Sequence, residues 1–567
     1  MRLTTLLFTF LICMQGTAQQ AAEALDEVIE KVQNYRSYER SDFPLGLFTE
    51  ELYRKEADFA RERLQELQAI DKKALTETER ISAELLRFRL QEDVDYYQYE
   101  AYLNPLLSDY GFHLSLPYHV QPLNNRRSVE IYLQKLRSLP TYVDQHLVLL
   151  REGLEKGITQ PRVIFNGYES TYNDQIVENP SKSYYYSPFL ELPGVFSAEE
   201  QDSIRRLAEQ VVAEYVIPQF KRIKTFFEEE YLPQTRTSVG VSEIPNGREY
   251  YQNRLNYYTT LDLTAEEIHQ IGLDEVARIN TEMKKIIEEV EYDGSFEDFI
   301  EFLRTDEQFY ADTPEELLSL ARDISKRIDA ELPRFFSKLP RRPYGVAPVP
   351  DAIAPKYTTG RYIGASSDTR PGYYWVNTYD LPSRPTYVLP ALTAHEAVPG
   401  HHLQIELNAE LGDSIPSFRK GFYLSAFGEG WGLYSEFLAE EMGIYTTPYE
   451  KFGKFTYEQW RACRLVVDTG IHAMGWSREQ AVQFLKENTA LSLHEINTEV
   501  DRYISWPGQA ISYKMGELKI RELREKAETA LGEDFDIRAF HAIILEQGTV
   551  TMKIMEERVN NWIETSL

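Results

Sequence analysis

Apolar residues recur at intervals of three and four positions along most of the chain, which is the spacing of one face of an α-helix. The clearest run follows Thr264, whose hydroxyl pairs with Glu267 as a capping box at a helix start. The same spacing predicts helices over residues 50–99, 197–229, 314–339 and from 389 to the C-terminus. The chain is therefore predicted to be mainly α-helical.

The helical pattern is interrupted between about residues 340 and 390. Prolines and glycines cluster there, and two short β-prone segments follow at residues 357–359 and 372–377. The second segment is a candidate edge strand that a bound peptide would extend, which would place Tyr374 and Asn377 against the substrate. A hairpin covered by helices is the alternative. Either way, the sequence predicts a small β-sheet directly before the most polar motif of the chain.

The N-terminus has the three parts of a secretory signal peptide. Arg2 supplies the positive charge, residues 3–14 are apolar, and small residues precede a cleavage point near Ala18. The apolar stretch is shorter than the roughly 20 residues needed to cross a bilayer, and no later segment is apolar enough to do so. Cys13 follows a bulky residue where lipid attachment requires a small one, and cleavage leaves Cys463 as the single cysteine. We expect a periplasmic or secreted protein without disulfides.

Composition narrows the class of protein. The chain has 567 residues, of which 43% are hydrophobic and 27% charged, and its formal net charge is −29. Such a negative surface repels phosphate backbones, so nucleic-acid binding is excluded from the expected functions. We divide the chain into a signal peptide (1–18), an N-terminal helical region (19–350) and a catalytic, metal-binding region (351–567). The last two are expected to form parts of a single two-lobed domain.

Three of the ten histidines fall within eight residues: His395, His401 and His402. A helix that carries His-Glu followed by further histidines is typical of zinc peptidases, in which two imidazoles bind Zn²⁺ and the glutamate is the general base. On a straight helix His401 or His402 would lie about 9 to 10.5 Å along the axis from His395. The intervening Pro399-Gly400 pair is expected to break the helix and bring one of them back. Glu396 is the expected base, and the second ligand is either His401 or His402.

A third zinc ligand is expected from the segment FGEGWGLYSE. Glu429 and Glu436 are seven positions apart, which places both on one face of a helix. Glu429 is the candidate ligand, and Glu436 is a candidate acceptor for a hydrogen bond from a ligand imidazole. The glycines at 428, 430 and 432 would let a second helix approach closely. The alternative is a solvated acidic stripe.

Peptide hydrolysis also requires a donor to the oxyanion that forms on the attacked carbonyl. The segment YISWPGQAISYK offers Tyr513, Lys514, Gln509 and Tyr503 as candidates. We favour Tyr513. An ordinary Pro-Gly junction between two helices would explain the segment equally well.

As a set, these motifs resemble a known bacterial family. HEAVPGHHLQ, EGWGLYSE, RLVVDTGIHAMGWS and PGQAISYKMG are similar to the family called domain of unknown function 885, over nearly the whole mature chain. The resemblance implies a relationship with gluzincin-type zinc metallopeptidases and a mostly helical fold with a long cleft between two lobes. It also implies that His395, His401 and Glu429 bind zinc and that Glu396 is the general base.

These observations predict an exported metallopeptidase that acts on short peptides with one Zn²⁺ ion. Glu396 would accept the proton of the attacking water, and Tyr513 would stabilise the oxyanion. The expected partner is a peptide substrate, without nucleic acid and without a membrane span. The alternative is a non-catalytic protein that binds metal or peptide and retains the peptidase fold.

Overall fold

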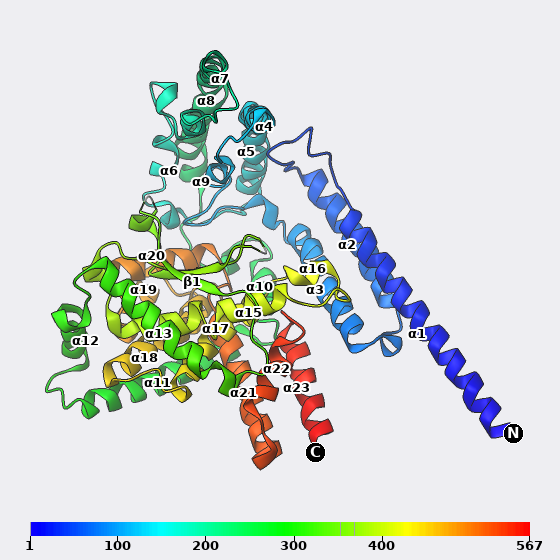
Figure 1. Cartoon of the computed structure of the whole chain (residues 1–567). Coiled ribbons are helices and arrows are strands. Elements are labelled where there is room, and N and C mark those ends of the chain that lie inside the picture. The colour runs from blue at the N-terminus through cyan, green and yellow to red at the C-terminus, as the bar shows by residue number, and fades with distance from the viewer. Residues whose placement is uncertain (1, 352, 368) are drawn as a thin grey trace. The chain divides into compact units, whose positions relative to one another are not determined.

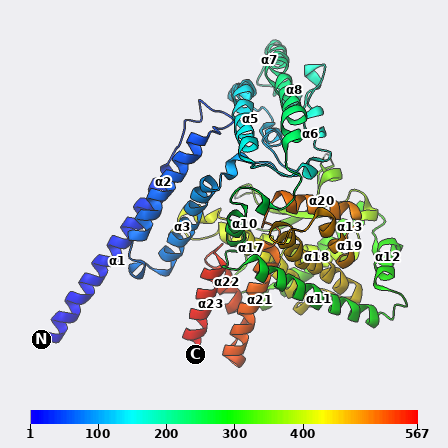
Figure 2. The ribbon, with the colours of Figure 1, turned by 180° about the vertical axis from the view of Figure 1, so that it is seen from behind.

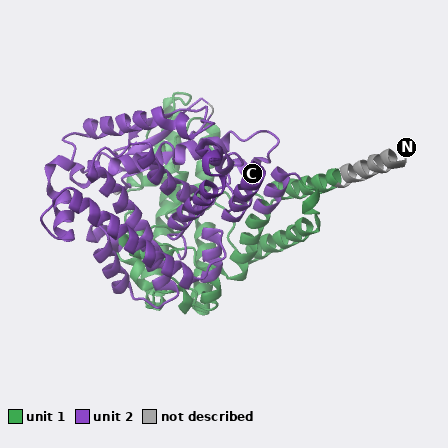
Figure 3. Ribbon diagram, turned by 90° about the horizontal axis from the view of Figure 1, so that it is seen from below, with its two compact units in different colours: residues 1–75, 86–250, 498–506 green, residues 76–85, 251–497, 507–567 purple. Residues whose placement is uncertain are grey.

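The computed structural model is mainly α-helical and contains one small sheet (Figure 1). It describes the backbone of residues 2–351, 353–367 and 369–567, and side chains from residue 18 onward except at positions 352, 356 and 368. The chain forms two compact units, which Figure 3 colours separately. Unit 1 comprises residues 1–75, 86–250 and 498–506, and unit 2 comprises residues 76–85, 251–497 and 507–567.

Unit 1 is built from helices and from the connections between them. Its helices are α1 (Arg2–Asn34), α2 (Glu50–Ala69), α4 (Arg126–Arg137), α5 (Leu139–Lys156), α6 (Ser170–Asn173), α7 (Ala198–Val211), α8 (Ile217–Thr225) and α9 (Leu232–Gln234). Three further helices pass from one unit to the other: α3 (Glu77–Gln98), α10 (Gly247–Thr259) and α20 (Leu493–Ser505).

Unit 2 contains the sheet and the motifs expected to carry chemistry. Its strands are β1 (Tyr344–Pro348), β2 (Gly360–Ile363) and β3 (Gly372–Val376). Its helices are α11 (Ala265–Glu289), α12 (Phe296–Thr305), α13 (Pro314–Phe335), α14 (Leu389–Glu396), α15 (His401–Ala409), α16 (Ser417–Lys420), α17 (Ser425–Glu441), α18 (Pro448–His472), α19 (Arg478–Asn488), α21 (Ser512–Leu531), α22 (Ile537–Leu545) and α23 (Met552–Ser566). The predicted domain boundary near residue 350 falls inside this unit.

The predicted capping box begins one of the longest helices of unit 2. The Thr264 hydroxyl accepts from the Glu267 backbone N–H, and the Glu267 carboxylate accepts from the Thr264 N–H, so this prediction is confirmed. The helix, α11, lies alongside α18 (Figures 1 and 2). A Cβ on Gly272 would meet Leu465 and Val466 side-chain atoms at 2.7 and 2.8 Å, so glycine permits this close packing.

The sheet has the strand order β1-β3-β2, with β1 parallel and β2 antiparallel to β3. The strand predicted at 372–377 is therefore the central strand, and the prediction of an edge strand is wrong. Both of its edges pair with other strands, which leaves none for a peptide. Tyr374 and Asn377 are fully buried, so neither side chain is available at a surface. Residues outside the segment decide this, because the neighbours of a strand are supplied by the rest of the fold.

The strand predicted at residues 357–359 begins instead at Gly360. The Asn377 side-chain amide donates hydrogen bonds to the carbonyls of Ala354, Tyr357 and Thr358. Those carbonyls therefore accept hydrogen bonds from a side chain and not from the backbone of a paired strand. The Asn377 side chain therefore stabilises the loop before β2.

The predicted signal peptide, residues 1–18, lies almost wholly outside the residues whose side chains are described. Among the described residues, no helix combines the length and apolar character needed to span a bilayer. Cys463 is a free, buried thiol in α18.

Candidate metal centre

The break between His395 and His401 has the form that the Pro-Gly pair predicts. Helix α14 ends at Glu396 and α15 begins at His401. The Gly400 N–H donates to the Ala394 carbonyl at 3.0 Å, and a Cβ on Gly400 would collide with the carbonyl oxygen of His395. Only glycine fits this turn. The turn brings the two imidazole centroids to 4.7 Å from each other.

A tryptophan of α17 also holds this turn in place through a hydrogen bond. The Trp431 indole is fully buried, and its Nε1–H donates to the Pro399 carbonyl at 2.8 Å. Because a buried indole N–H requires an acceptor, the bond ties the turn to the helix that carries Glu429. Trp431 lies inside one of the predicted motifs, but its structural role depends on tertiary contacts and could not be predicted from the motif.

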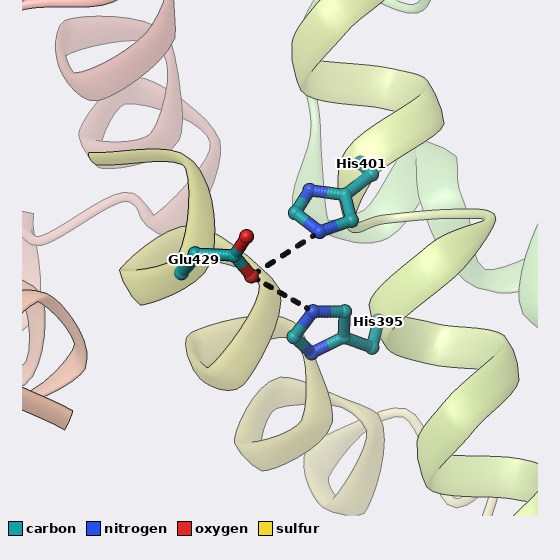
Figure 4. A group of neighbouring side chains, drawn as sticks. All are labelled: His395, His401 and Glu429. Atoms are coloured by element: carbon teal, nitrogen blue, oxygen red, sulfur yellow. Dashed lines mark ion pairs between the residues drawn. The ribbon is translucent and has the colours of Figure 1, made fainter. Parts of the chain in front are cut away.

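His395, His401 and Glu429 converge on one point (Figure 4). The Nε2 atoms of both histidines lie 3.5 Å from the same carboxylate oxygen, Oε2 of Glu429. One potential ligand atom from each residue lies within 4.8 Å of the other two. His395 is buried, whereas His401 and Glu429 are partly accessible. The structure therefore brings together three of the residues expected to bind the metal.

This donor set fits a zinc ion. Two imidazole nitrogens and one carboxylate oxygen are ligands that zinc accepts in three-ligand catalytic sites, in which a fourth position stays open. Tetrahedral ligands at about 2.0 to 2.1 Å from zinc are about 3.3 Å apart, close to the 3.5 Å observed here between nitrogen and oxygen atoms. Small adjustments of the side chains would complete such a site.

Glu436 orients one of the imidazoles, as the spacing on α17 predicts. The Nδ1–H of His395 donates to Glu436 Oε1 at 2.7 Å, which leaves Nε2 turned toward Glu429. Burial lowers the pKa of His395, but its hydrogen bonds to Glu429 and Glu436 outweigh this effect and raise the pKa to about 10. The Arg461 guanidinium lies 3.8 Å from Glu436 and balances part of the buried negative charge.

The glycines of α17 each make room for a different neighbour. A Cβ on Gly432 would lie 2.6 to 2.9 Å from atoms of the His395 ring. A Cβ on Gly430 would lie 2.6 Å from backbone atoms of Gly516 in α21, the helix packed beside α17. The predicted close approach of a second helix is confirmed. Gly432 additionally leaves room for the ring of the candidate ligand His395.

His402 is turned away from this cluster. Its Nδ1 lies 2.9 Å from the Tyr362 hydroxyl, which also donates to Glu406 at 2.9 Å. Glu406 in turn accepts from Arg342 at 3.0 Å. Burial lowers the pKa of His402 to about 4, so its imidazole is neutral in this polar chain. Of the two alternatives left open by the sequence, the geometry places His401 beside His395.

Glu396 is partly accessible at the end of α14, one residue after His395. Its Oε2 accepts a hydrogen bond from the backbone N–H of Tyr362 in β2 at 2.7 Å. The edge strand β2 thus orients the expected base through its backbone. No sequence pattern marked Tyr362, because its contribution depends on the position of its strand.

The four oxyanion candidates have different surroundings. The Lys514 ammonium is fully buried and lies 2.8 to 2.9 Å from three carboxylates, those of Glu275, Glu458 and Glu517, so it stabilises the core rather than serving as a free donor. Tyr503 is buried and belongs to unit 1. The Gln509 side chain is also mostly buried.

Tyr513 remains the candidate donor with a partly accessible side chain. Its ring lies 4.5 Å from the Arg464 guanidinium on α18. Asp468 accepts a hydrogen bond from the N–H of Gly508, which precedes the helix of Tyr513, and another from the Tyr251 hydroxyl. The sequence did not indicate a second tyrosine, Tyr423, whose hydroxyl donates to Glu429 at 2.9 Å.

Two comparisons with known proteins, one with family models and one with solved structures, give matches that extend over nearly the whole chain. The family model described as "Bacterial protein of unknown function (DUF885)" matches residues 33–559. Comparison with curated proteins gives no match.

Two solved structures, each described as a "putative lipoprotein", have similar folds. That from Colwellia psychrerythraea is 27% identical, with a TM-score of 0.85 over 97% of this chain and 99% of that one. That from Shewanella oneidensis, described as of unknown function, is 17% identical, with a TM-score of 0.70 over 96% and 99% of the two chains. The second likeness concerns the fold alone.

Proposed function

The chain belongs to the DUF885 family of bacterial proteins, and from this premise and the geometry of its metal centre we propose that it is an exported zinc metallopeptidase acting on short peptides. The observation that carries the proposal is the convergence of His395, His401 and Glu429 on one point, with Glu396 directly after His395 in the chain. A group of two imidazoles, a carboxylate ligand and a neighbouring glutamate has the composition of a zinc hydrolase site.

Each residue of the centre has a role in this proposal. His395, His401 and Glu429 would hold the ion, and Glu436 accepts from the Nδ1–H of His395, which leaves Nε2 available as the ligand atom. Bound zinc would lower the pKa of water to about 7 and polarise the peptide carbonyl. Glu396 accepts the proton of the attacking water and later donates it to the leaving amine. Tyr513 is the proposed donor to the oxyanion.

The proposal extends to relationship and location. The His-Glu pair followed by a returning histidine supports a relationship with gluzincin-type peptidases, with a stretched spacing that the turn at Pro399 accommodates. A two-lobed, metallopeptidase-like architecture belongs to the same proposal. Export is supported by the charged and apolar pattern of the first 18 residues and by the description of the similar solved structures.

The substitution Glu396→Gln tests the proposed reaction. We expect hydrolysis of a short-peptide library to fall about 10² to 10⁴-fold, because the proton acceptor is lost. Elemental analysis should still find one zinc per chain, since Glu396 is not a ligand. Glu410→Gln is the matched control, because this carboxylate instead accepts from the backbone N–H of Arg341.

Two outcomes would contradict the proposal in different ways. Full activity of Glu396→Gln would show that another group accepts the proton. A wild-type protein that binds zinc stoichiometrically but hydrolyses no peptide would instead favour the non-catalytic binding protein.

A further inference from the structure

Tyr423 is an exposed tyrosine whose hydroxyl faces inward. It lies in the short loop between α16 and α17, and about half of its side chain is exposed, 50%. Its O–H nevertheless donates to Oε1 of Glu429 at 2.9 Å. The other oxygen of that carboxylate, Oε2, is the atom that faces His395 and His401.

The ring of Tyr423 packs into a space that a glycine of the neighbouring helix leaves open. A Cβ on Gly428 would lie 2.5 to 3.0 Å from the Cε2, Cζ and hydroxyl atoms of the ring, so only glycine leaves the ring its place. Gly428 directly precedes Glu429 in α17. Gly428, the first glycine of the segment FGEGWGLYSE, therefore leaves the space that the hydrogen bond from Tyr423 to Glu429 requires.

The loop that carries Tyr423 is anchored within unit 2. Arg419, which is almost fully buried, donates to the Thr78 carbonyl at 3.2 Å and to the Ser82 hydroxyl at 3.1 Å. The Asn408 side chain donates to the Lys420 carbonyl at 2.7 Å. These bonds fix the loop backbone just before Tyr423, so the position of its hydroxyl is set by the fold rather than by an exposed side chain alone.

We propose that Tyr423 is a positioning residue of the metal centre, which keeps Glu429 a ligand through one oxygen only. An ionised carboxylate can bind a metal ion through one oxygen or through both. A donor on Oε1 reserves that oxygen and leaves Oε2 for the ion, because a charge-assisted hydrogen bond of this kind competes with a second metal contact. The position that Oε1 would otherwise fill stays open for water and substrate.

The inference rests on the proposed metal site, and Co²⁺ binding tests it independently of catalysis. The visible absorption of Co²⁺ weakens as its coordination number increases. We expect Tyr423→Phe to bind Co²⁺ at the same stoichiometry with weaker visible absorption, because Glu429 then binds through both oxygens. X-ray absorption of the Zn²⁺-loaded variant should show one additional oxygen neighbour.

A second variant and a control sharpen the test. Gly428→Ala fills the space that the ring occupies and should reproduce the Co²⁺ spectrum of Tyr423→Phe. Tyr379→Phe replaces a tyrosine of similar exposure, 51%, and should leave the Co²⁺ spectrum of the wild type unchanged. Circular dichroism of all three variants checks that each remains folded.

The outcomes separate this inference from the proposed function. Co²⁺ and Zn²⁺ spectra of Tyr423→Phe identical to those of the wild type would overturn the role of Tyr423 and leave the peptidase proposal standing. The expected spectral change in a protein that hydrolyses no peptide would support Tyr423 and overturn the peptidase proposal. A wild-type protein that binds neither ion would overturn both.

Discussion

Two pairs of histidines, one in each unit, have opposite electrostatic environments. In unit 1, His146 is surrounded by the rings of Phe48, Phe112 and Tyr142 at 4.4 to 4.7 Å, and His113 lies nearby. Burial lowers the pKa of both histidines to about 3. Neither ring nitrogen of His146 has a hydrogen-bond partner among the described residues.

In unit 2, the pair His395 and His401 is instead surrounded by carboxylates. Glu429 lies 3.5 Å from both rings, and Glu436 accepts from His395. These acidic neighbours outweigh burial and raise the pKa of His395 to about 10. The comparison shows that the carboxylates around His395 supply negative charge that would stabilise a bound cation, whereas the aromatic rings around His146 supply none.

The largest expected effect comes from removing a ligand of the second pair. His395→Ala should weaken zinc binding by more than about 100-fold, because loss of an orienting partner alone already costs roughly 10 to 100-fold. His402→Gln is the control, since this histidine contacts Tyr362 and should leave the affinity within a few-fold. Isothermal titration with Zn²⁺ measures both. Equal losses in the two variants would show that the geometric distinction between the histidines is irrelevant.

A smaller effect is expected from the acidic neighbour that distinguishes the two pairs. Glu436→Gln should lower zinc affinity about 10 to 100-fold, because the His395 ring loses its charged acceptor. Glu440→Gln, one turn further along α17, changes a carboxylate that pairs with Lys454 at 3.0 Å. That control should bind zinc as the wild type does. An unchanged affinity in Glu436→Gln would mean that burial, rather than the carboxylate, orients His395.

The smallest effect concerns the aromatic pair and appears as a dependence of stability on pH. An unfolded histidine has a pKa near 6.5, whereas burial lowers the pKa of folded His146 to about 3. The unfolded state therefore binds protons first as the pH falls, and the free energy of unfolding decreases below pH 6.5. For one histidine the loss between pH 7.5 and 5.5 is about 1.4 kcal/mol.

His146→Phe should remove this loss while keeping an aromatic ring in the core of unit 1. The measurement is guanidinium unfolding of wild type and variant at pH 7.5 and 5.5, comparing the change in unfolding free energy. The same pH dependence in both proteins would show that His146 is already protonated or solvated in the folded state.

Much of the fold could be predicted because helices depend on local spacing. The capping box followed from the spacing of Thr264 and Glu267, and the long helices followed from apolar residues at three- and four-residue intervals. Helix α17 formed despite its three glycines, since Gly430 and Gly432 contact neighbours that a larger residue would displace. The strand order of the sheet was harder to predict, because it depends on residues that are distant in sequence. The segment 372–377 carries no mark of whether it lies at an edge or at the centre.

For the same reason, only part of the candidate site could be predicted from the sequence. Donor types and the helix break at Pro399 are local, so His395, Glu396 and Glu429 stood out as a set. Tyr423 did not, because a tyrosine in a loop has no periodic pattern. It acquires its role from the space beside Gly428 and from its distance to Glu429.

The sequence by itself determined that the chain is mainly helical, that its helix breaks between two histidines and that imidazole and carboxylate donors are concentrated nearby. Only the tertiary structure decided that His401 rather than His402 turns toward His395. The physical reason is that the direction of a chain after a break depends on its contacts. Here the Trp431 indole holds the Pro399 carbonyl and the Tyr362 hydroxyl holds His402, and both partners come from segments distant in sequence.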